Sequence, residues 1–287
     1  MKISKKTLSI ILFVLAGICV LAAVILLVKG RIEDRRMEEA LDELRPTQSA
    51  ETTQAPSTVE GEPTVTASPE PSTEKTPAST EEFERVANPY SDSFLANKDM
   101  AAWLQIPGTN IDYPVMWTPE DETYYLYRAF DGSENKNGCL LLDDESCVDP
   151  LTTNLIIHGH NMKSGAMFGN LTDYENQDFY KEHKNIILYT EECQRNYEII
   201  AVFRSQVYRK TDQVFKFYKF FQADTQEEFD DFYNNIKQLS QYDTGVTAEF
   251  GDHFLTLSTC VYHVEQGRFV VVAKEVEPGD YYLPIQE

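Results

Sequence analysis

Residues 254–271 read FLTLSTCVYHVEQGRFVV and hold the clearest structural signal in the chain. Two β-like runs, residues 254–259 and 269–276, flank a polar loop, which is the pattern of a β-hairpin. In such a hairpin Cys260 ends the first strand and Arg268 opens the second, so the two side chains face each other at its mouth. A neighbouring cation favours the thiolate, the nucleophilic form of cysteine. The hairpin therefore offers an activated cysteine at a strand end, although taken alone it favours the simpler interpretation of a buried structural cysteine beside a surface arginine.

The rest of the folded part also consists mainly of short β-like runs, which makes eight predicted strands and favours a closed barrel or sandwich. The further strands cover residues 103–106, 111–115, 138–142, 154–158, 185–189 and 197–207. An amphipathic helix is predicted over residues 225–240, with Thr225 and Glu228 in the spacing of a capping box. Its aromatic stripe indicates core packing rather than a ligand site. A weaker helical pattern covers residues 174–183.

The chain divides into parts of different composition. Residues 7–28 are uncharged and long enough to cross a bilayer, with a cytoplasmic terminus expected at 1–6 and a charged juxtamembrane segment at 29–45. The apolar core of a cleaved signal peptide, the alternative, is shorter. Residues 46–80 hold six prolines and nine threonines, which predicts a disordered stalk. The folded domain is expected over residues 82–287.

Acidity is concentrated in the folded part. The net charge of the 287-residue chain is −22, and almost all of it lies beyond residue 80. Proteins that bind nucleic acids need a basic surface to neutralise phosphates, so we expect no nucleic-acid partner. No motif calls for a cofactor, and we expect none.

A histidine segment follows one of the apolar strands. After residues 154–157 the chain reads His158-Gly-His160-Asn-Met. A cysteine nucleophile needs a histidine close by in space as a proton carrier, whatever their separation in sequence. A competing interpretation is a zinc site formed by His158, His160, Cys260 and His263, although no second pair of Cys-x-x-Cys type supports it.

An acidic loop leaves two further alternatives open. Its carboxylates could bind calcium through oxygen ligands, although a solvated loop is the more common outcome in so acidic a domain. Two cysteines flank this loop and could form a disulfide in an exported domain. The carboxylates are Asp143, Asp144, Glu145 and Asp149, and the cysteines are Cys139 and Cys147.

Four stretches of the sequence resemble sortases, most closely those of class B. They are WLQIPGTNIDYPV at 103–115, NLIIHGHNMKSGAMFGNL at 154–171, TLSTC at 256–260 and GRFVV at 267–271. The resemblance implies a mainly β fold, an eight-stranded sortase-type barrel with a few helices. A long helix would lie between strands 6 and 7, and an N-terminal transmembrane helix would precede the barrel.

The resemblance also implies a cysteine transpeptidase. Cys260 would attack the carbonyl of a threonine in the C-terminal sorting signal of a surface protein and form a thioacyl enzyme. An amine of peptidoglycan or of its lipid-linked precursor would then accept the acyl group. His160 would carry the proton and Arg268 would stabilise the substrate oxygen. The resemblance further suggests substrate contacts at His158, Ser258 and Thr259.

One residue departs from the class B pattern, which commonly has tyrosine where this chain has His158. Residues two apart on a strand share a face, so both His158 and His160 could reach the site. We assign His160, because it occupies the matching position in Gly-His-Asn-Met. The resemblance places the domain outside a Gram-positive cell, anchored to the membrane by the N-terminal helix. A catalytically silent binding module with the same barrel is the alternative.

Overall fold

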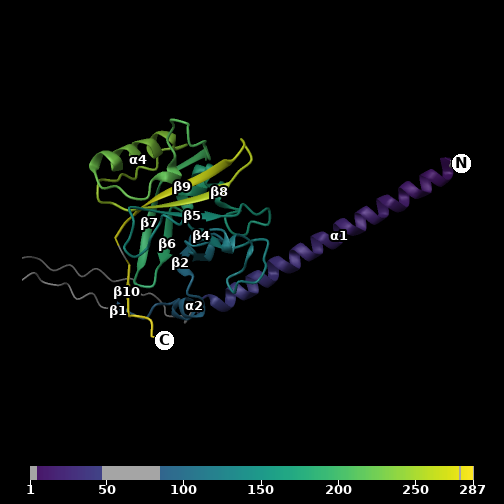
Figure 1. The fold of residues 1–287 in the computed structure, drawn as a ribbon, viewed down its shortest axis with the longest axis horizontal. Helices are drawn as coiled ribbons and strands as arrows, with labels where there is room; N and C mark the ends of the chain where they lie inside the picture. The colour runs from purple at the N-terminus through teal and green to yellow at the C-terminus, as the bar shows by residue number, and fades with distance from the viewer. Residues whose placement is uncertain (1–4, 47–84, 278, 287) are drawn as a thin grey trace, which may run out of the picture.

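The computed structural model describes residues 5–46, 85–277 and 279–286. Figure 1 shows a β-barrel from which one long helix projects. The barrel strands are β2 (Met100–Gln105), β3 (Asp112–Met116), β4 (Leu140–Leu142), β5 (Asn154–Gly159), β6 (Asn185–Tyr189), β7 (Gln194–Gln206), β8 (Phe254–Cys260) and β9 (Gly267–Glu275). They close in the order β2-β3-β4-β5-β8-β9-β7-β6. The predicted eight-stranded barrel is therefore confirmed.

Helices and short elements surround this barrel. They are α1 (Lys5–Leu44), α2 (Ser91–Ala96), α3 (Gln177–Glu182) and α4 (Gln226–Leu239), the 3₁₀ turns η1 (Tyr124–Tyr127), η2 (Leu171–Glu175) and η3 (Phe217–Lys219), and a parallel pair of β1 (Arg85–Val86) and β10 (Tyr281–Tyr282). The helix predicted between the sixth and seventh barrel strands is α4, and its capping box is present. The helix predicted over residues 174–183 is shorter in the structure. α3 covers only Gln177–Glu182, and the first residues of the predicted helix belong to η2.

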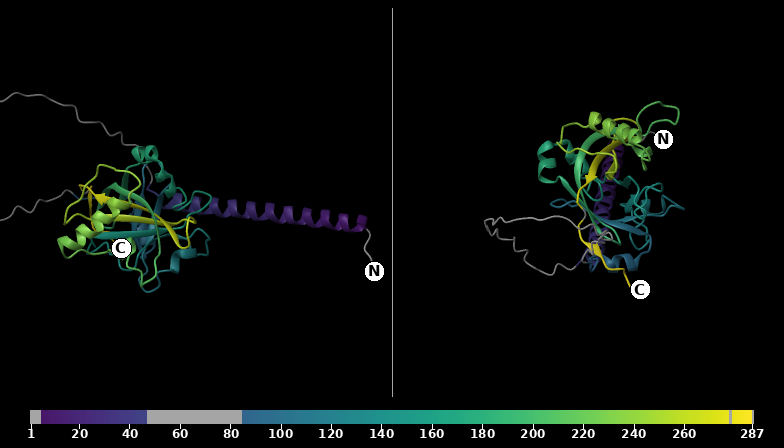
Figure 2. Two further views of the ribbon diagram at one scale, coloured as in Figure 1. Left: turned by 90° about the horizontal axis from the view of Figure 1, so that it is seen from above. Right: turned by 90° about the vertical axis from the view of Figure 1, so that its left-hand side faces the viewer.

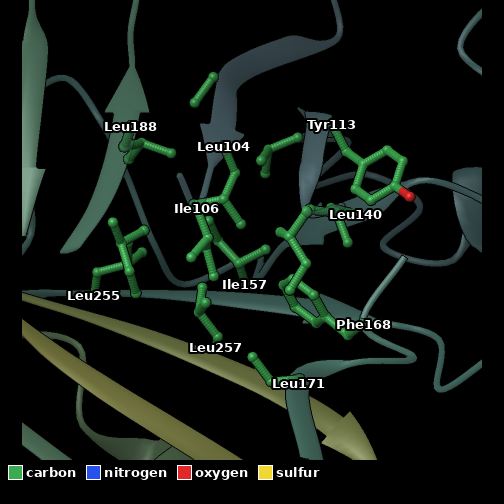
Figure 3. Packing of buried hydrophobic residues seen from close by; sticks show 14 of the residues in the cluster. Leu104, Ile106, Tyr113, Leu140, Ile157, Phe168, Leu171, Leu188, Leu255 and Leu257 are labelled. Atoms are coloured by element: carbon green, nitrogen blue, oxygen red, sulfur yellow. The ribbon is translucent and has the colours of Figure 1, made fainter. Parts of the chain in front are cut away.

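Strand alternation separates two cores on either side of the barrel wall. Leu255, Leu257 and Ile157 point into the barrel interior, as Figure 3 shows. Val270 and Val272 of β9 belong to a second cluster that lies under α4. Because both faces of the wall are buried here, β9 has a continuous apolar run from Phe269 to Ala273, whereas β8 buries the polar side chains of Thr256, Ser258 and Thr259.

Aromatic packing holds α4 onto the outside of the barrel. Phe229 and Phe232 are buried, and the rings of Phe220 and Phe232 stack with centroids 4.0 Å apart. The Phe229 ring also packs on Phe254 of β8, with centroids 5.3 Å apart. The aromatic stripe is therefore core packing, as predicted.

The N-terminal helix runs without a break through both segments that the sequence separates at residue 28. Its first part projects away from the barrel (Figure 2). By length and composition it is apolar enough to cross a membrane, a property that anchors and signal sequences share. Its last turns dock on the barrel: Met37 and Leu41 are buried, and Arg45 Nε lies 2.9 Å from Asp112 Oδ2.

Because of this docking, the second half of α1, and not the predicted stalk, connects the apolar run to the barrel. Arg45 lies against β3, and Arg85 begins β1, so the two residues on either side of the predicted stalk both lie at the domain. The rigid helix after Val28 therefore sets the spacing between the apolar run and the barrel, at about 1.5 Å per residue. The predicted disordered stalk itself lies outside the described residues, except for Pro46.

Candidate active site

Strand register brings three of the predicted residues to one end of the barrel wall. Cys260 on β8 pairs directly with Arg268 on β9, as the hairpin predicts. On the other side of β8 lies β5, whose last paired residue, Gly159, is opposite Thr259. His160 comes one residue later, at the level of Cys260. A thiol, a guanidinium and an imidazole thus lie at three adjacent strand ends.

The ring of His160 is held from outside the strand. Its Nε2 lies 2.9 Å from the carbonyl oxygen of Leu126. Because a carbonyl only accepts hydrogen bonds, Nε2 carries the hydrogen, and Nδ1 is the nitrogen that can exchange a proton. Tyr127, the last residue of η1, stacks on the imidazole with ring centroids 5.3 Å apart. The hydrogen bond fixes the tautomer, and both contacts fix the orientation of the ring.

Steric crowding explains why the residue before His160 is a glycine. A Cβ atom on Gly159 would lie 2.6 Å from side-chain carbons of both Leu140 and Phe168, a separation that real contacts do not reach. Glycine therefore lets β5 pass close to the barrel interior just before the histidine. Any larger residue would displace the strand end that carries His160.

Two hydrogen bonds connect the ends of β5 and β8. The amide of Asn161 donates to the carbonyl oxygen of Cys260 over 2.9 Å, and the hydroxyl of Thr259 donates to Gly159 over 2.7 Å. Cys260 itself is exposed, whereas Cys139 and Cys193 are buried. The five cysteines of the chain are free, so the alternative of a Cys139–Cys147 disulfide is not adopted.

The guanidinium of Arg268 is available to a ligand. It is half-buried and donates only to backbone carbonyls, those of Gln266 and Gly267, over 3.3 and 3.1 Å. In the part of the chain that the structure describes, it forms no ion pair with a carboxylate. The backbone N–H of Val261 is occupied by Gly267 O at 3.0 Å. Arg268 is therefore the group beside Cys260 with uncompensated positive charge.

His158 is in a different environment from His160. Its Nε2 lies 3.0 Å from Asp143 Oδ2, a carboxylate from the acidic loop. Burial alone would raise the pKa of Asp143, but the hydrogen bond and charge of His158, together with hydrogen bonds from Glu145 and Asp144, lower this pKa overall. The two histidines are thus distinguished by their partners, a carboxylate for His158 and a carbonyl for His160.

The other predicted contacts are not at the surface. Ser258 and Thr259 are each only 1% exposed, because β8 is covered on both faces up to its last residue. We therefore do not retain these two side chains as substrate contacts. Among the described residues, no three or more His, Cys, Asp or Glu side chains are grouped to hold a metal ion. Neither the zinc nor the calcium interpretation gains support from this arrangement.

Three neighbours of the site are absent from the sequence-based prediction. Asn161 directly follows His160, and its position in the histidine segment is a signal that could have been used. Leu126 and Tyr127 are 34 and 33 residues before His160 and belong to no recognisable motif. Their role depends on the path of the loop between β3 and β4, which local sequence patterns do not predict.

Comparisons with known proteins agree with this geometry. A family model described as a sortase domain matches residues 104–276. Sortase B of Listeria monocytogenes is 35% identical over 182 residues, which cover 63% of this chain and 71% of that protein.

Solved structures give the same result. A Staphylococcus aureus sortase B–substrate complex has a TM-score of 0.60 at 26% identity and covers 68% of this chain and 87% of that one. A crystal structure of sortase B complexed with triglycine has a TM-score of 0.60 at 25% identity and covers 67% and 87%. The chain described here belongs to the sortase family and, within it, to class B.

Proposed function

We propose that this protein is a membrane-anchored cysteine transpeptidase that cleaves the C-terminal sorting signal of surface proteins after threonine. The observation that carries the proposal is the pairing of exposed Cys260 with Arg268, next to the strand end that bears His160. A nucleophile, a proton carrier and a cation are the three groups that acyl transfer through a thioester requires.

In the first half-reaction, the Cys260 thiolate attacks the carbonyl carbon of the substrate threonine. Arg268 stabilises the negative charge that develops on the carbonyl oxygen. The C–N bond then breaks as His160 gives its Nδ1 proton to the departing amine, which leaves a thioester on Cys260. This role for Nδ1 is supported by the contact of Nε2 with Leu126 O, which leaves Nδ1 as the exchanging nitrogen.

In the second half-reaction, an acceptor amine attacks the thioester carbonyl. His160 Nδ1 takes the proton from this amine, the thiolate leaves, and a new amide bond forms without any net redox change. We propose that the acceptor is a peptidoglycan amine or its lipid-linked precursor. A related sortase B forms a complex with triglycine, which makes this peptide a suitable first acceptor to test.

The long helix α1 supports a membrane location for this reaction. We propose that its apolar part spans the membrane with the N-terminus in the cytoplasm and that the catalytic domain, residues 82–287, lies outside the cell. The ion pair between Arg45 and Asp112 and the buried Met37 and Leu41 support a fixed connection between anchor and barrel.

The proposal is tested with a library of fluorogenic peptides that vary around a central threonine, incubated with the full-length protein and triglycine. We expect cleavage after threonine and a product in which triglycine is joined to the new carboxyl end. A library that stays uncleaved, with Cys260 still reactive toward thiol reagents, would instead favour a binding module.

Substitution of Arg268 tests its proposed role. Arg268→Ala is expected to lower kcat/KM about 10²- to 10³-fold, because removal of one donor to a developing oxyanion costs this much in other acyl-transfer enzymes. The matched control is Arg209→Ala, which removes an exposed positive charge that lies in a loop. Equal rates for the two variants would remove Arg268 from the mechanism.

A further inference from the structure

The two contacts that hold the His160 ring come from the loop between β3 and β4, not from the barrel strands. The Leu126 carbonyl and the Tyr127 ring that hold the imidazole both belong to η1. Leu126 is only half-buried and Tyr127 is exposed, so packing of these two side chains does not fix the carbonyl. The buried Tyr125 anchors η1 through hydrogen bonds of its hydroxyl with Asp99 and Asn97, and a further segment contacts the Leu126 carbonyl itself.

A second segment, residues 135–139, packs directly against η1. The N–H groups of Asn135 and Cys139 donate to the carbonyls of Tyr127 and Tyr125 over 2.9 and 3.1 Å. Between them, Gly138 has a φ of +60°, and a Cβ atom there would lie 2.3 Å from Leu126 O. The backbone of Gly138 therefore lies against the same carbonyl that accepts the His160 hydrogen bond.

The adjacent residue, Asn137, connects this segment to the membrane-proximal part of α1. Its side chain is fully buried, and its Nδ2 lies 3.1 Å from Asp34 Oδ1 and 3.3 Å from Met37 Sδ. Lys136 adds ion pairs to Glu33 and Asp34 at 3.4 and 3.3 Å. Both donor contacts of the Asn137 amide thus go to α1 and none to the barrel.

Apolar contacts also hold this part of the helix, because Met37 and Leu41 belong to the core cluster of the barrel. A cavity of about 990 Å³ lies between α1 and the barrel and is lined on one side by Met37 and Leu41 and on the other by Tyr113, Tyr127 and Met167. Met37 and Leu41 fix the helix against the barrel, and the polar contacts of Asn137 and Lys136 define where it meets residues 135–139.

We propose that Asn137, held by Asp34 of α1, is a positioning residue that keeps the Leu126 carbonyl against His160. The path runs from Asp34 through Asn137 and Gly138 to Leu126. It makes the docked anchor helix part of the support of the active site. This inference rests on the proposed role of His160 as proton carrier.

Loss of this support has a specific chemical consequence. If residues 137–138 move, the Leu126 carbonyl no longer faces Nε2, and nothing then favours the tautomer with hydrogen on Nε2. A fraction of the imidazole will carry its hydrogen on Nδ1 instead. The neutral ring in that state cannot accept a proton at the nitrogen that faces the reaction.

The test uses full-length protein in nanodiscs and a matched set of substitutions on α1. Asp34→Ala removes the acceptor of Asn137 together with one partner of Lys136, whereas Glu33→Ala removes the other partner of Lys136 and a contact with Lys29 but leaves Asn137 untouched. Asp34→Asn keeps an oxygen acceptor for Asn137 and serves as the rescue variant. Both positions lie on α1, so the barrel sequence stays unchanged.

Two readouts are required. The ring ¹⁵N shifts of His160, assigned by their loss in His160→Gln, report which nitrogen carries the hydrogen. For Asp34→Ala we expect a mixture of tautomers and a fall in kcat of about threefold to tenfold, the size of effect seen for residues that act through others, with KM nearly unchanged. Glu33→Ala and Asp34→Asn are expected to retain the Nε2–H tautomer and kcat within about twofold.

Unchanged ¹⁵N shifts in Asp34→Ala, or equal effects of Asp34→Ala and Glu33→Ala, would overturn the inference. The tautomer measurement needs no substrate, so its result stands apart from the proposed function. Full activity of His160→Gln would contradict the role of His160 while leaving the structural coupling from Asp34 to its ring measurable.

Discussion

Cys260→Ala is expected to abolish both peptide cleavage and transfer to triglycine, with a loss of at least about 10⁴-fold in kcat/KM. Alanine offers no nucleophile, and the other thiols of the barrel are elsewhere: Cys139 and Cys193 are buried. Because Cys260 is exposed at a strand end and its side chain packs into neither core, the variant is expected to fold normally. Steady-state assays with the best library peptide measure the effect.

Cys147→Ala is the matched control for this substitution. Cys147 is half-buried, and its Sγ contacts the Asp149 carbonyl at 3.1 Å in the acidic loop. We expect its activity to stay within about twofold of the parent protein, since surface substitutions away from special features have small effects. Cleavage that survives in Cys260→Ala would assign the nucleophile to another residue.

The second large effect is expected at the histidines. His160→Ala should lower kcat/KM about 10²- to 10⁴-fold, the usual contribution of a positioned acid or base. His158→Ala should cost less than about tenfold, because the His158 ring is engaged by Asp143 rather than placed at the end of β5. His158→Tyr, which introduces the residue common in class B, should be similarly active.

The comparison between these two histidine variants is decisive because the histidines lie only two residues apart, His158 within β5 and His160 directly after its end. Far-UV circular dichroism checks that each variant is folded. A larger loss in His158→Ala than in His160→Ala would transfer the proton-carrying role to His158. It would also give the Asp143 carboxylate, 3.0 Å from His158, the role of orienting that ring.

Much of the barrel could be predicted because its strands are local patterns. The hairpin of β8 and β9 is readable from residues 254–271 alone, and its register puts Cys260 opposite Arg268 as expected. The helix α4 is equally predictable, since the capping box and the aromatic spacing are both local signals. Family resemblance then supplies the closure of the barrel, which periodicity leaves open between barrel and sandwich.

Other features depend on contacts between distant segments and were not predictable. The sequence changes from apolar to charged at residue 28, which suggests a boundary between two segments. The helix nevertheless continues through this point, and α1 ends only where it docks on the barrel. Ser258 and Thr259 are polar residues next to Cys260 in the sequence, yet both are buried in the folded barrel. The contact between Leu126 and His160 joins residues 34 apart, without any motif at Leu126.

The central claim is that Cys260 forms a thioester with the substrate. Intact-protein and peptide mass spectrometry, after incubation with a cleavable threonine peptide in the absence of any acceptor amine, measures this intermediate directly. We expect a mass increase equal to the acyl part of the peptide, located on Cys260 and removed by triglycine or hydroxylamine. Cleaved peptide without any adduct on Cys260, or an adduct on a different residue, would contradict the claim.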